Sequence, residues 1–240
     1  MQGRAGLSPA EAPGGSRARW AAVVSVACAL LVAEARTLAA EPNAAPVSAS
    51  PTRLESLLRQ FSAAPGLVAR FRETKRLQLL QEPLHSSGVL HFAPPDRLLR
   101  RVEEPVASTL LVVGDEVAIR GAGGDWNVDL DAHPVVRSFV DGFRLLLRGD
   151  LDELQNAYAI EFESSEDPGD EAWKIRLVPR SEELRGVVAT IAIVGRGRIV
   201  RELRVVETNG DETLDEFFDV DADRRFSDAE LQSLFRAPDP

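Results

Sequence analysis

The sequence predicts a mainly β protein with some α-helix, in which a long, curved antiparallel sheet is covered by a few short helices. Runs in which apolar and polar residues partly alternate follow one another along most of the chain, as in half-buried strands. Turns rich in Gly, Pro, Asn and Asp separate these runs. A sheet of about 10 or 11 strands normally curls, and its concave apolar face then needs a cover. The amphipathic helical stretches between the strands are suited to that role.

The N-terminal residues predict a secretory signal peptide over residues 1–40. Basic residues precede the apolar run Trp20–Ala33, and small residues around Ala35 and Ala40 offer cleavage sites. The run is too short to span a bilayer comfortably, and a permanent anchor is the alternative interpretation. Residues 41–51 are rich in Ala, Pro and Ser and are expected to be a disordered spacer. We therefore expect a single folded domain over residues 52–240.

Charge and cysteine content exclude several classes of function. The formal net charge of −10 would repel a nucleic acid or an anionic lipid surface. Cys28 is the one cysteine and lies inside the apolar run, so a mature chain without the signal peptide has no thiol. Disulfides, thiolate zinc sites and cysteine nucleophiles are then excluded. Lipid attachment at Cys28 is the alternative, although the residues before it match the required motif poorly.

The first half of the domain predicts one helix followed by a meander of strands. Thr52 and Glu55 form a capping box, and leucines follow at helical spacing until Ala64-Pro65-Gly66 ends the helix. This amphipathic helix must bury its apolar stripe on the sheet that follows. A tight hairpin turn is expected at Gly114-Asp115. The predicted strands of this half are Phe71–Leu79, Val89–Phe92, Arg97–Val102, Thr109–Val113, Glu116–Arg120 and 126–130.

Two helices are predicted between this meander and a second one. Pro134 suits the first position of a helix with an apolar stripe, and Gly149 can end it. Asp150 and Glu153 then begin a second, shorter helix. The later predicted strands are Ala159–Glu163, Trp173–Val178, Val187–Val194, Ile199–Glu207 and Glu212–Val220, before a last helix capped by Ser227 and Glu230.

Residues that carry chemistry are scarce, and the pattern predicts no catalytic site, metal or cofactor. His85, His91 and His133 lack metal-ligand spacing, and no nucleophile elbow or phosphate-binding loop accompanies them. The acidic residues between Glu161 and Glu171 are expected to form a solvated edge.

Residues Asp219–Glu230 match the ligand positions of an EF-hand calcium loop. Arg224, however, stands where that loop needs a glycine for its sharp turn. The preceding residues also alternate like a strand instead of showing a helical stripe. We therefore expect a strand, a polar turn and a capped helix here, with calcium binding as the alternative.

A resemblance to a known family rests on several segments and on their order along the chain. These segments are Phe71–Lys75, residues 87–98 (Ser-Gly-Val-Leu-His-Phe-Ala-Pro-Pro-Asp-Arg-Leu), Glu104-Pro105 before the hairpin at 110–115, Leu177–Arg180 and residues 206–211. With this order, the sequence from about Thr52 to Ala237 resembles the LolA family of periplasmic outer-membrane lipoprotein carriers and looks like a divergent member. The resemblance implies an incomplete β-barrel whose open side is closed by helices. It also implies a periplasmic location and a role that is not enzymatic.

The resemblance further implies a cavity that holds the acyl chains of lipoproteins, or a related lipid, away from water. Burial of each methylene contributes about 0.8 kcal/mol, so a few chains can be carried reversibly without covalent chemistry. Family members latch their helices with an arginine directly before the proline of a strand turn. Pro94 stands there in this sequence, and Arg97 or Arg100 is expected to substitute. The residues expected to line the cavity are Phe71, Leu90, Phe92, Leu98, Leu110, Trp126, Trp173, Ile175, Ile191, Ile193, Leu203 and Val205, with Phe139 and Phe143 on the lid.

The implied partners are an acylated cargo, an inner-membrane exporter and an outer-membrane acceptor, for a protein that is itself a monomer. The cargo is a lipoprotein, or a glycolipid or polyketide-linked lipid. One alternative function is an envelope scaffold or sensor that binds a protein, which predicts an interior filled by the protein's own side chains. Another is a lipid hydrolase, which needs a histidine and a carboxylate that converge at the cavity mouth.

Overall fold

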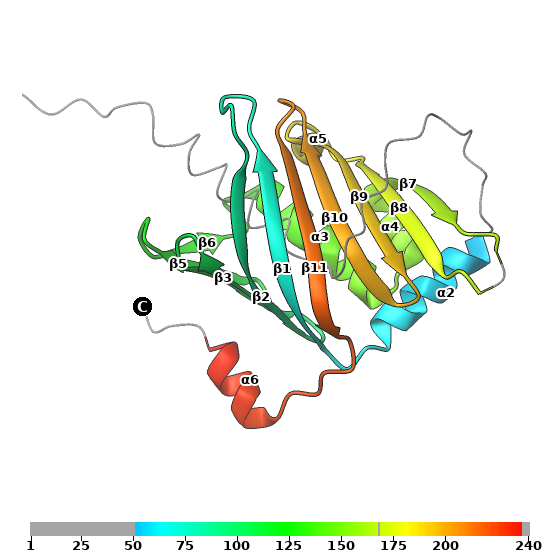
Figure 1. The fold of residues 1–240 in the computed structure, drawn as a ribbon, viewed down its shortest axis with the longest axis horizontal. Coiled ribbons are helices and arrows are strands. Elements are labelled where there is room, and N and C mark those ends of the chain that lie inside the picture. The colour runs from blue at the N-terminus through cyan, green and yellow to red at the C-terminus, as the bar shows by residue number, and fades with distance from the viewer. Residues whose placement is uncertain (1–50, 168, 237–240) are drawn as a thin grey trace, which may run out of the picture.

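The computed structural model describes residues 51–167 and 169–236, and these residues form one long antiparallel sheet with helices against it (Figure 1). The predicted signal peptide lies outside the described residues. No helix between residues 51 and 236, residue 168 apart, is long and apolar enough to cross a membrane.

The sheet contains eleven strands in the order β6-β5-β4-β3-β2-β1-β11-β10-β9-β8-β7. Strands β6 and β7 form the two edges, so the barrel is incomplete, as predicted. The chain passes from one edge to the other through α3 and α4, which places these helices along the open side. The strands are β1 Leu67–Arg76, β2 Leu84–Ala93, β3 Arg97–Glu104, β4 Ser108–Val113, β5 Glu116–Gly121, β6 Trp126–Asp129, β7 Tyr158–Ser164, β8 Ala172–Pro179, β9 Val188–Arg196, β10 Ile199–Glu207 and β11 Glu212–Asp221.

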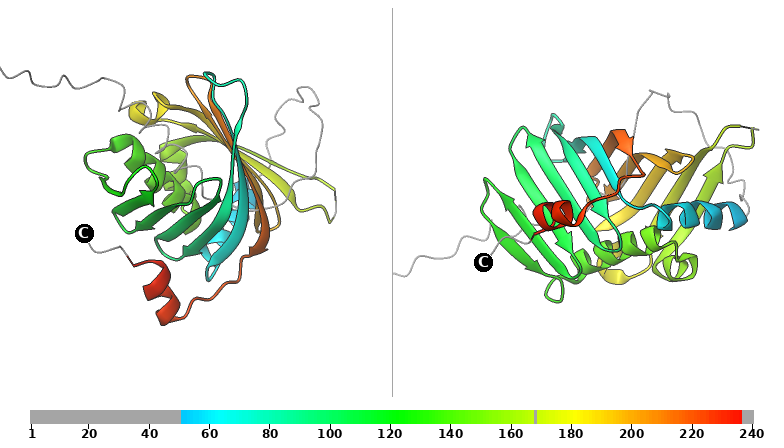
Figure 2. Two further views of the ribbon diagram at one scale, coloured as in Figure 1. Left: turned by 60° about the vertical axis from the view of Figure 1, so that its left-hand side comes forward. Right: turned by 90° about the horizontal axis from the view of Figure 1, so that it is seen from below.

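The sheet curves around α2, α3 and α4, whereas α6 lies on its convex face (Figure 2). The helices are α2 Pro51–Ser62, α3 Pro134–Arg148, α4 Leu151–Ala157, α5 Glu182–Arg185 and α6 Asp228–Leu234.

Local sequence signals explain where these helices begin and end. Pro134 begins α3, where its missing N–H costs nothing. Gly149 ends α3 in the left-handed conformation, with φ of 72°, which glycine adopts without a steric penalty. Asp150 accepts a hydrogen bond from the Glu153 N–H at the start of α4. Ser227 and Glu230 form the predicted capping box of α6.

Several element boundaries differ from the sequence-based prediction, and strands β1 and β2 begin at Leu67 and Leu84, before the predicted Phe71 and Val89. Strand β1 ends at Arg76, because the chain turns at Leu77–Leu80, where the Leu80 N–H donates to the Leu77 carbonyl oxygen at 2.9 Å. Helix α2 begins at Pro51, one residue before the predicted cap. The short helix α5, capped by Ser181, was not predicted, because four residues are too few to show a helical period.

Apolar side chains are buried on both faces of the sheet. Alternation along β3 shows this, because Leu98 faces the concave side and Leu99 faces the convex side, and each is 3% exposed. The convex cluster joins Leu99 and Leu111 to Phe235 after α6. The concave cluster is far larger and lies between the sheet and α2, α3, α4 and α5.

Candidate functional site

A continuous layer of apolar side chains covers the concave face, because strand pairing aligns the inward positions of neighbouring strands. One row crosses β2 to β6 through Phe92, Leu98, Val112, Val117 and Val128. Another crosses β7 to β10 through Phe162, Ile175, Ile193 and Leu203.

Every residue predicted to line a cavity belongs to this layer. Trp126, on the edge strand β6, is partly buried, and the others are buried. The residues that were chosen from the alternating pattern therefore lie on one common face of the sheet. Their role in binding remains a prediction.

Helices α2 and α3 pack on this layer through their apolar stripes. The ring of Phe61 in α2 meets Trp173 edge-on, with 5.8 Å between the ring centroids. The ring of Phe143 in α3 meets Phe92 in the same way at 5.9 Å. Phe139, the other predicted lid residue, is buried in the same cluster. Helices α2 and α3 thus contact the sheet through non-covalent contacts between aromatic rings.

Tyr158 fixes α3 to the start of β7. A Cβ atom on Gly142 would lie 2.0 Å from the Tyr158 hydroxyl oxygen, so only a glycine in α3 lets this ring lie against the helix. Burial, with a smaller contribution from the Asp141 carboxylate, raises the pKa of Tyr158 to about 12. The hydroxyl therefore stays neutral at physiological pH.

Arg144 fastens α3 to the rim of the sheet. Its guanidinium donates to the Gly114 carbonyl oxygen in the β4–β5 turn and to Asp115 Oδ1, the latter at 3.1 Å. It also donates to Asp141 Oδ1 on its own helix at 3.2 Å. Arg144 was not predicted as a latch residue, because one of its partners is a backbone carbonyl group thirty residues away in the chain.

Arg53 fastens α2 near the opposite edge of the sheet. Its guanidinium donates to Ser164 Oγ at 2.9 Å and to the Ser165 carbonyl oxygen at 3.0 Å. Ser164 is the last residue of the edge strand β7. The two lid helices are therefore fastened on opposite sides of the half-barrel by arginine side chains.

Arg100, one of the two residues predicted to be a latch, lies within the concave face at 3% exposure. Its Nη2 donates to Glu73 Oε2 on β1 and to Asp215 Oδ1 on β11, both at 2.9 Å. Its guanidinium carbon lies 3.8 Å from the centre of the Phe71 ring. Arg100 thus joins three strands across β2, whose Gly88 at an inward position leaves room beside Phe71.

The Asp215 carboxyl is completely buried, and its Oδ2 atom has no hydrogen-bond partner in the described structure. Burial raises the pKa of Asp215 well above its ordinary value, and the neighbouring Glu73 adds to the rise, whereas Arg100 and Lys75 oppose it. The carboxyl group therefore favours its protonated form more than an exposed aspartate does.

Arg97, the other predicted latch residue, lies on the convex side of β3. It pairs with Ala93 and Val113, which belong to the convex cluster. Neither Arg97 nor Arg100 hydrogen-bonds to a helix among the described residues. Among the described residues, α3 is fastened by Arg144 and α2 by Arg53, and Arg180 after β8 donates to the Gln155 carbonyl oxygen of α4 at 3.0 Å.

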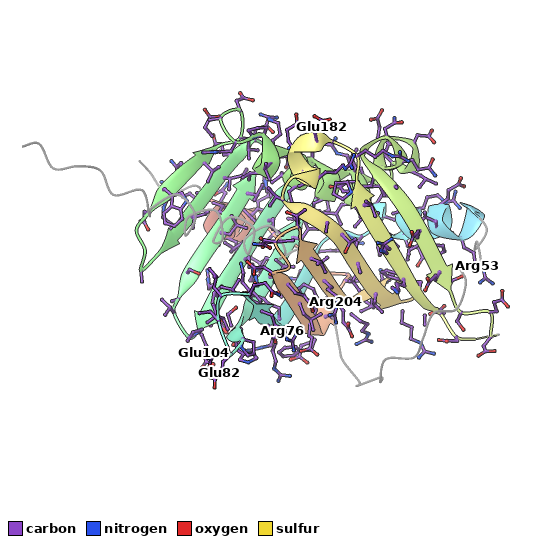
Figure 3. The ribbon with its side chains drawn as sticks, turned by 90° about the horizontal axis from the view of Figure 1, so that it is seen from above. Arg53, Arg76, Glu82, Glu104, Glu182 and Arg204 are labelled. Atoms are coloured by element: carbon purple, nitrogen blue, oxygen red, sulfur yellow. The ribbon has the colours of Figure 1, made fainter. Side chains whose placement is uncertain are left out.

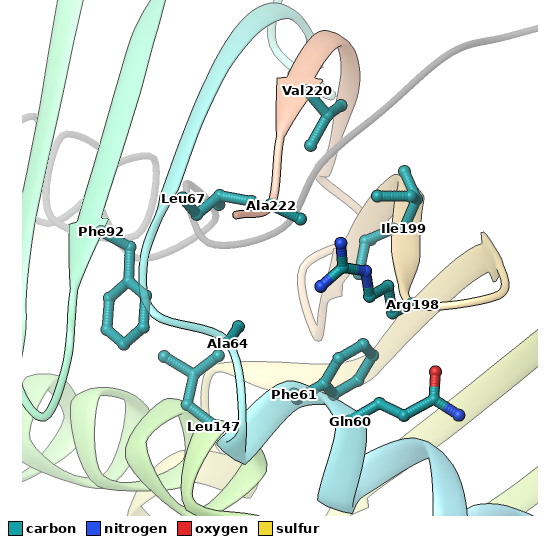
Figure 4. Close-up of a pocket in the computed structure, with 11 residues that line it drawn as sticks. Gln60, Phe61, Ala64, Leu67, Phe92, Leu147, Arg198, Ile199, Val220 and Ala222 are labelled. Carbon is teal, nitrogen blue, oxygen red and sulfur yellow. The ribbon is translucent and has the colours of Figure 1, made fainter. Parts of the chain in front are cut away.

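A small pocket opens at one end of the apolar layer, where the last turns of α2 and α3 meet the strand ends (Figure 4). Its volume is about 40 Å³. Arg198 lies at this pocket and donates to Asp223 Oδ1 at 2.9 Å. The lining residues are Gln60, Phe61, Ala64, Leu67, Phe92, Leu147, Arg198, Ile199, Val200, Val220 and Ala222.

The histidines lie at separate places. His85 is exposed on β2 beside Thr74, with 3.3 Å between its Nδ1 and the Thr74 Oγ1. His91 lies on the convex side near Phe226, and burial together with two arginines lowers its pKa. His133 precedes α3.

Two acidic residues of the EF-hand-like segment form ion pairs with arginines. Asp223 pairs with Arg198, and Glu230 pairs with Arg224 and accepts hydrogen bonds from Ser227. The described residues include no group of three or more His, Cys, Asp or Glu side chains placed to hold a metal ion.

Comparison with known proteins gives a family and several structural neighbours. A family model described as outer membrane lipoprotein carrier protein LolA-like matches residues 44–215. No functionally curated protein matches the chain.

Solved structures with a similar fold share little sequence identity with this chain. A DUF1329 family protein from Desulfovibrio piger is 11% identical, with a TM-score of 0.43, covering 76% of this chain and 96% of that one. The LolA superfamily protein NE2245 from Nitrosomonas europaea is 8% identical, with a TM-score of 0.41 and coverages of 73% and 96%. A chain of the MucA/MucB complex of Pseudomonas aeruginosa is 12% identical, with a TM-score of 0.45. The match covers 75% of this chain and 60% of that one.

Proposed function

The chain belongs to the family of LolA-like outer membrane lipoprotein carriers, and we propose that it is a non-catalytic periplasmic carrier of acyl chains. The cargo, a lipoprotein or a related lipid, binds between the concave face of the sheet and the lid helices. The observation that carries the proposal is the continuous apolar layer of the concave face, covered by helices that arginine side chains fasten near the rims.

Acyl chains can replace the lid on this layer at low cost. The lid stripe of α2 and α3 is apolar, so an inserted acyl chain exchanges one set of apolar contacts for another. Each methylene removed from water contributes about 0.8 kcal/mol, which makes a chain of ordinary length worth several kcal/mol. Binding is then strong enough for transport and remains reversible.

Loading requires the lid to move. The pocket of about 40 Å³ is far smaller than the roughly 300 Å³ at which small-molecule sites begin. Displacement of α3 breaks the Arg144 contacts with the β4–β5 turn, and displacement of α2 breaks the Arg53 contacts with Ser164 and Ser165. These hydrogen bonds are few and lie near the surface, so they can be broken while the sheet stays folded.

The test combines a binding assay with analysis of natural cargo. Lipids are extracted from protein purified from the periplasmic fraction and are identified by mass spectrometry. In a separate assay, the protein is titrated with a fluorescent fatty acid. The Leu147→Glu substitution places a carboxylate in the partly buried wall of the pocket. We expect it to weaken fatty acid binding by at least about tenfold and to remove co-purifying acylated species.

Gln155→Glu on α4 is the matched control. It adds the same charge at an exposed position and should bind like the wild type. Phe92→Glu changes the same pocket from the sheet side and is expected to act like Leu147→Glu. Wild-type protein that carries no acylated species and binds no fatty acid would remove the carrier proposal.

A second candidate function is an envelope scaffold or sensor that binds a protein. The burial of most predicted cavity residues within one apolar cluster favours it, because this function needs an interior filled by the protein's own side chains. In that case Leu147→Glu leaves partner binding unchanged, since the interior is not the binding surface.

A further inference from the structure

Large apolar side chains that stand exposed gather at one end of the sheet. In the described part of the chain these are Leu79 at 96% exposure, Leu80 at 46%, Leu84 at 50% and Val106 at 56%. The first three belong to the β1–β2 hairpin, and Val106 lies in the neighbouring β3–β4 turn. Pairing of Ser87 with Glu104 puts the two turns at the same end. Figure 3 shows Glu82 of the hairpin and Glu104, the last residue of β3, near each other in the view from above.

The hairpin tip is held in place. The Gln78 side-chain amide donates to the Gly210 carbonyl oxygen at 2.8 Å, and the Gln78 N–H donates to Asp211 Oδ1 at 2.7 Å. Both acceptors lie in the β10–β11 turn, so this turn braces the hairpin just before Leu79. The exposed leucines are therefore presented on a supported element, and such a cluster normally marks a contact surface.

The size of the cluster favours a bilayer over a folded protein as its partner. A stable protein interface buries about 800 Å² on each side and uses some 20 to 30 residues. A tip with a few apolar side chains is smaller than that. In a bilayer each inserted side chain contributes independently, so a few leucines suffice for a transient contact.

Charges around the tip define the kind of bilayer. Glu82, Glu103 and Glu104 flank the leucines, and the basic Arg76 lies 3.8 Å from Glu212, a carboxylate that it shares with Arg204. Glu103 likewise pairs with Arg70 at 3.5 Å. The four acidic side chains named here outnumber the basic Arg70, Arg76 and Arg204, an excess that disfavours anionic lipid and leaves neutral headgroups as the compatible surface.

We propose that the β1–β2 hairpin tip, with Leu79 at its apex, contacts membranes by inserting its leucine side chains among neutral phospholipids. The inference goes beyond the carrier function and does not rest on it, because the tip needs no cargo to bind. It assigns the β1–β2 end of the half-barrel to the membrane, whereas the small pocket opens at the opposite end of the strands.

A position-specific probe tests the contact in the full chain. Leu79→Trp is mixed with phosphatidylcholine vesicles or with the same lipid brominated on its acyl chains, and the wild-type fluorescence is subtracted. We expect the introduced indole to shift to shorter wavelength and to lose at least about half of its emission to the brominated lipid. Glu166→Trp, in the β7–β8 loop at the other end of the sheet, is the matched control and should stay unquenched.

A second variant measures the affinity that the leucines provide. Leu79→Ser with Leu80→Ser should lower vesicle binding about tenfold without changing the melting temperature, because both side chains are in an exposed turn. Phosphatidylglycerol in the vesicles should weaken wild-type binding. The proposal is overturned if the indole at position 79 stays unquenched, if the control indole is quenched equally, or if binding requires anionic lipid. The local probe also separates the tip from the apolar run near the N-terminus, which can bind vesicles by itself.

Discussion

Arg100 and Arg144 each contact two carboxylates, yet the two sites differ in their access to water. Arg100 and Asp215 are 3% and 0% exposed, whereas Arg144 and Asp115 are 12% and 72% exposed. Loss of Arg100 leaves charges in an apolar interior, whereas loss of Arg144 leaves them in solvent. The same chemistry therefore lies buried within the sheet at one site and links α3 to the sheet rim near solvent at the other.

The largest effect is expected from Arg100→Leu. It leaves Glu73 and Asp215 buried without their arginine, and removal of one partner from a buried ion pair costs about 3 to 5 kcal/mol. Urea unfolding should show this loss in the free energy of unfolding. Arg97→Leu, in the same strand but on the convex side, should change it by less than about 0.5 kcal/mol. Equal effects of the two substitutions would contradict the distinction between the two faces.

The pH dependence of stability gives the second effect. Because the pKa of Asp215 is raised in the folded state, its contribution is fully present below the unfolded pKa of about 3.9 and is lost as pH rises through the folded pKa. Between these two values, stability should fall with rising pH by up to about 1.4 kcal/mol per unit. Unfolding curves at several pH values should show this slope in the wild type and not in Asp215→Asn. A slope that persists in the variant would assign it to other groups.

Arg144→Gln should have a smaller effect on stability, about 1 kcal/mol or less, because Asp115 returns to water. It should also let α3 move, so fatty acid binding becomes faster and the amide protons of α3 exchange faster. Arg148→Gln, at an exposed position of the same helix, is the control. Unchanged exchange in Arg144→Gln would show that packing alone holds the lid.

Arg53→Gln is expected to have the smallest effect, about 0.5 kcal/mol or less, because its partners Ser164 and Ser165 are neutral and near the surface. Faster exchange should be confined to α2 and should leave α3 unaffected. Exchange that rises in both helices would show that the two fastenings act together.

Much of the fold follows from local patterns. Alternation with a period of two, broken by turn residues, indicated the strands, their antiparallel meanders and which residues share a strand face, whereas the concave position of Leu90 and Ile175 came from the structure. Capping residues such as Ser227, Glu230 and Gly149 determined helix ends. These signals act between residues close in the chain, so they can be recognised without a structure.

Contacts between distant segments were decided by the tertiary structure. Arg100 and Asp215 are separated by 115 residues, and the register of β1, β2, β3 and β11 brings them together. Arg144 donates to a backbone carbonyl oxygen, and because every residue has one, the sequence does not single out this partner. Helix α6 covers Leu99 from the far end of the chain. A sequence therefore reveals which side chains share a strand face, whereas their partners depend on how the sheet curves and which segments it brings side by side.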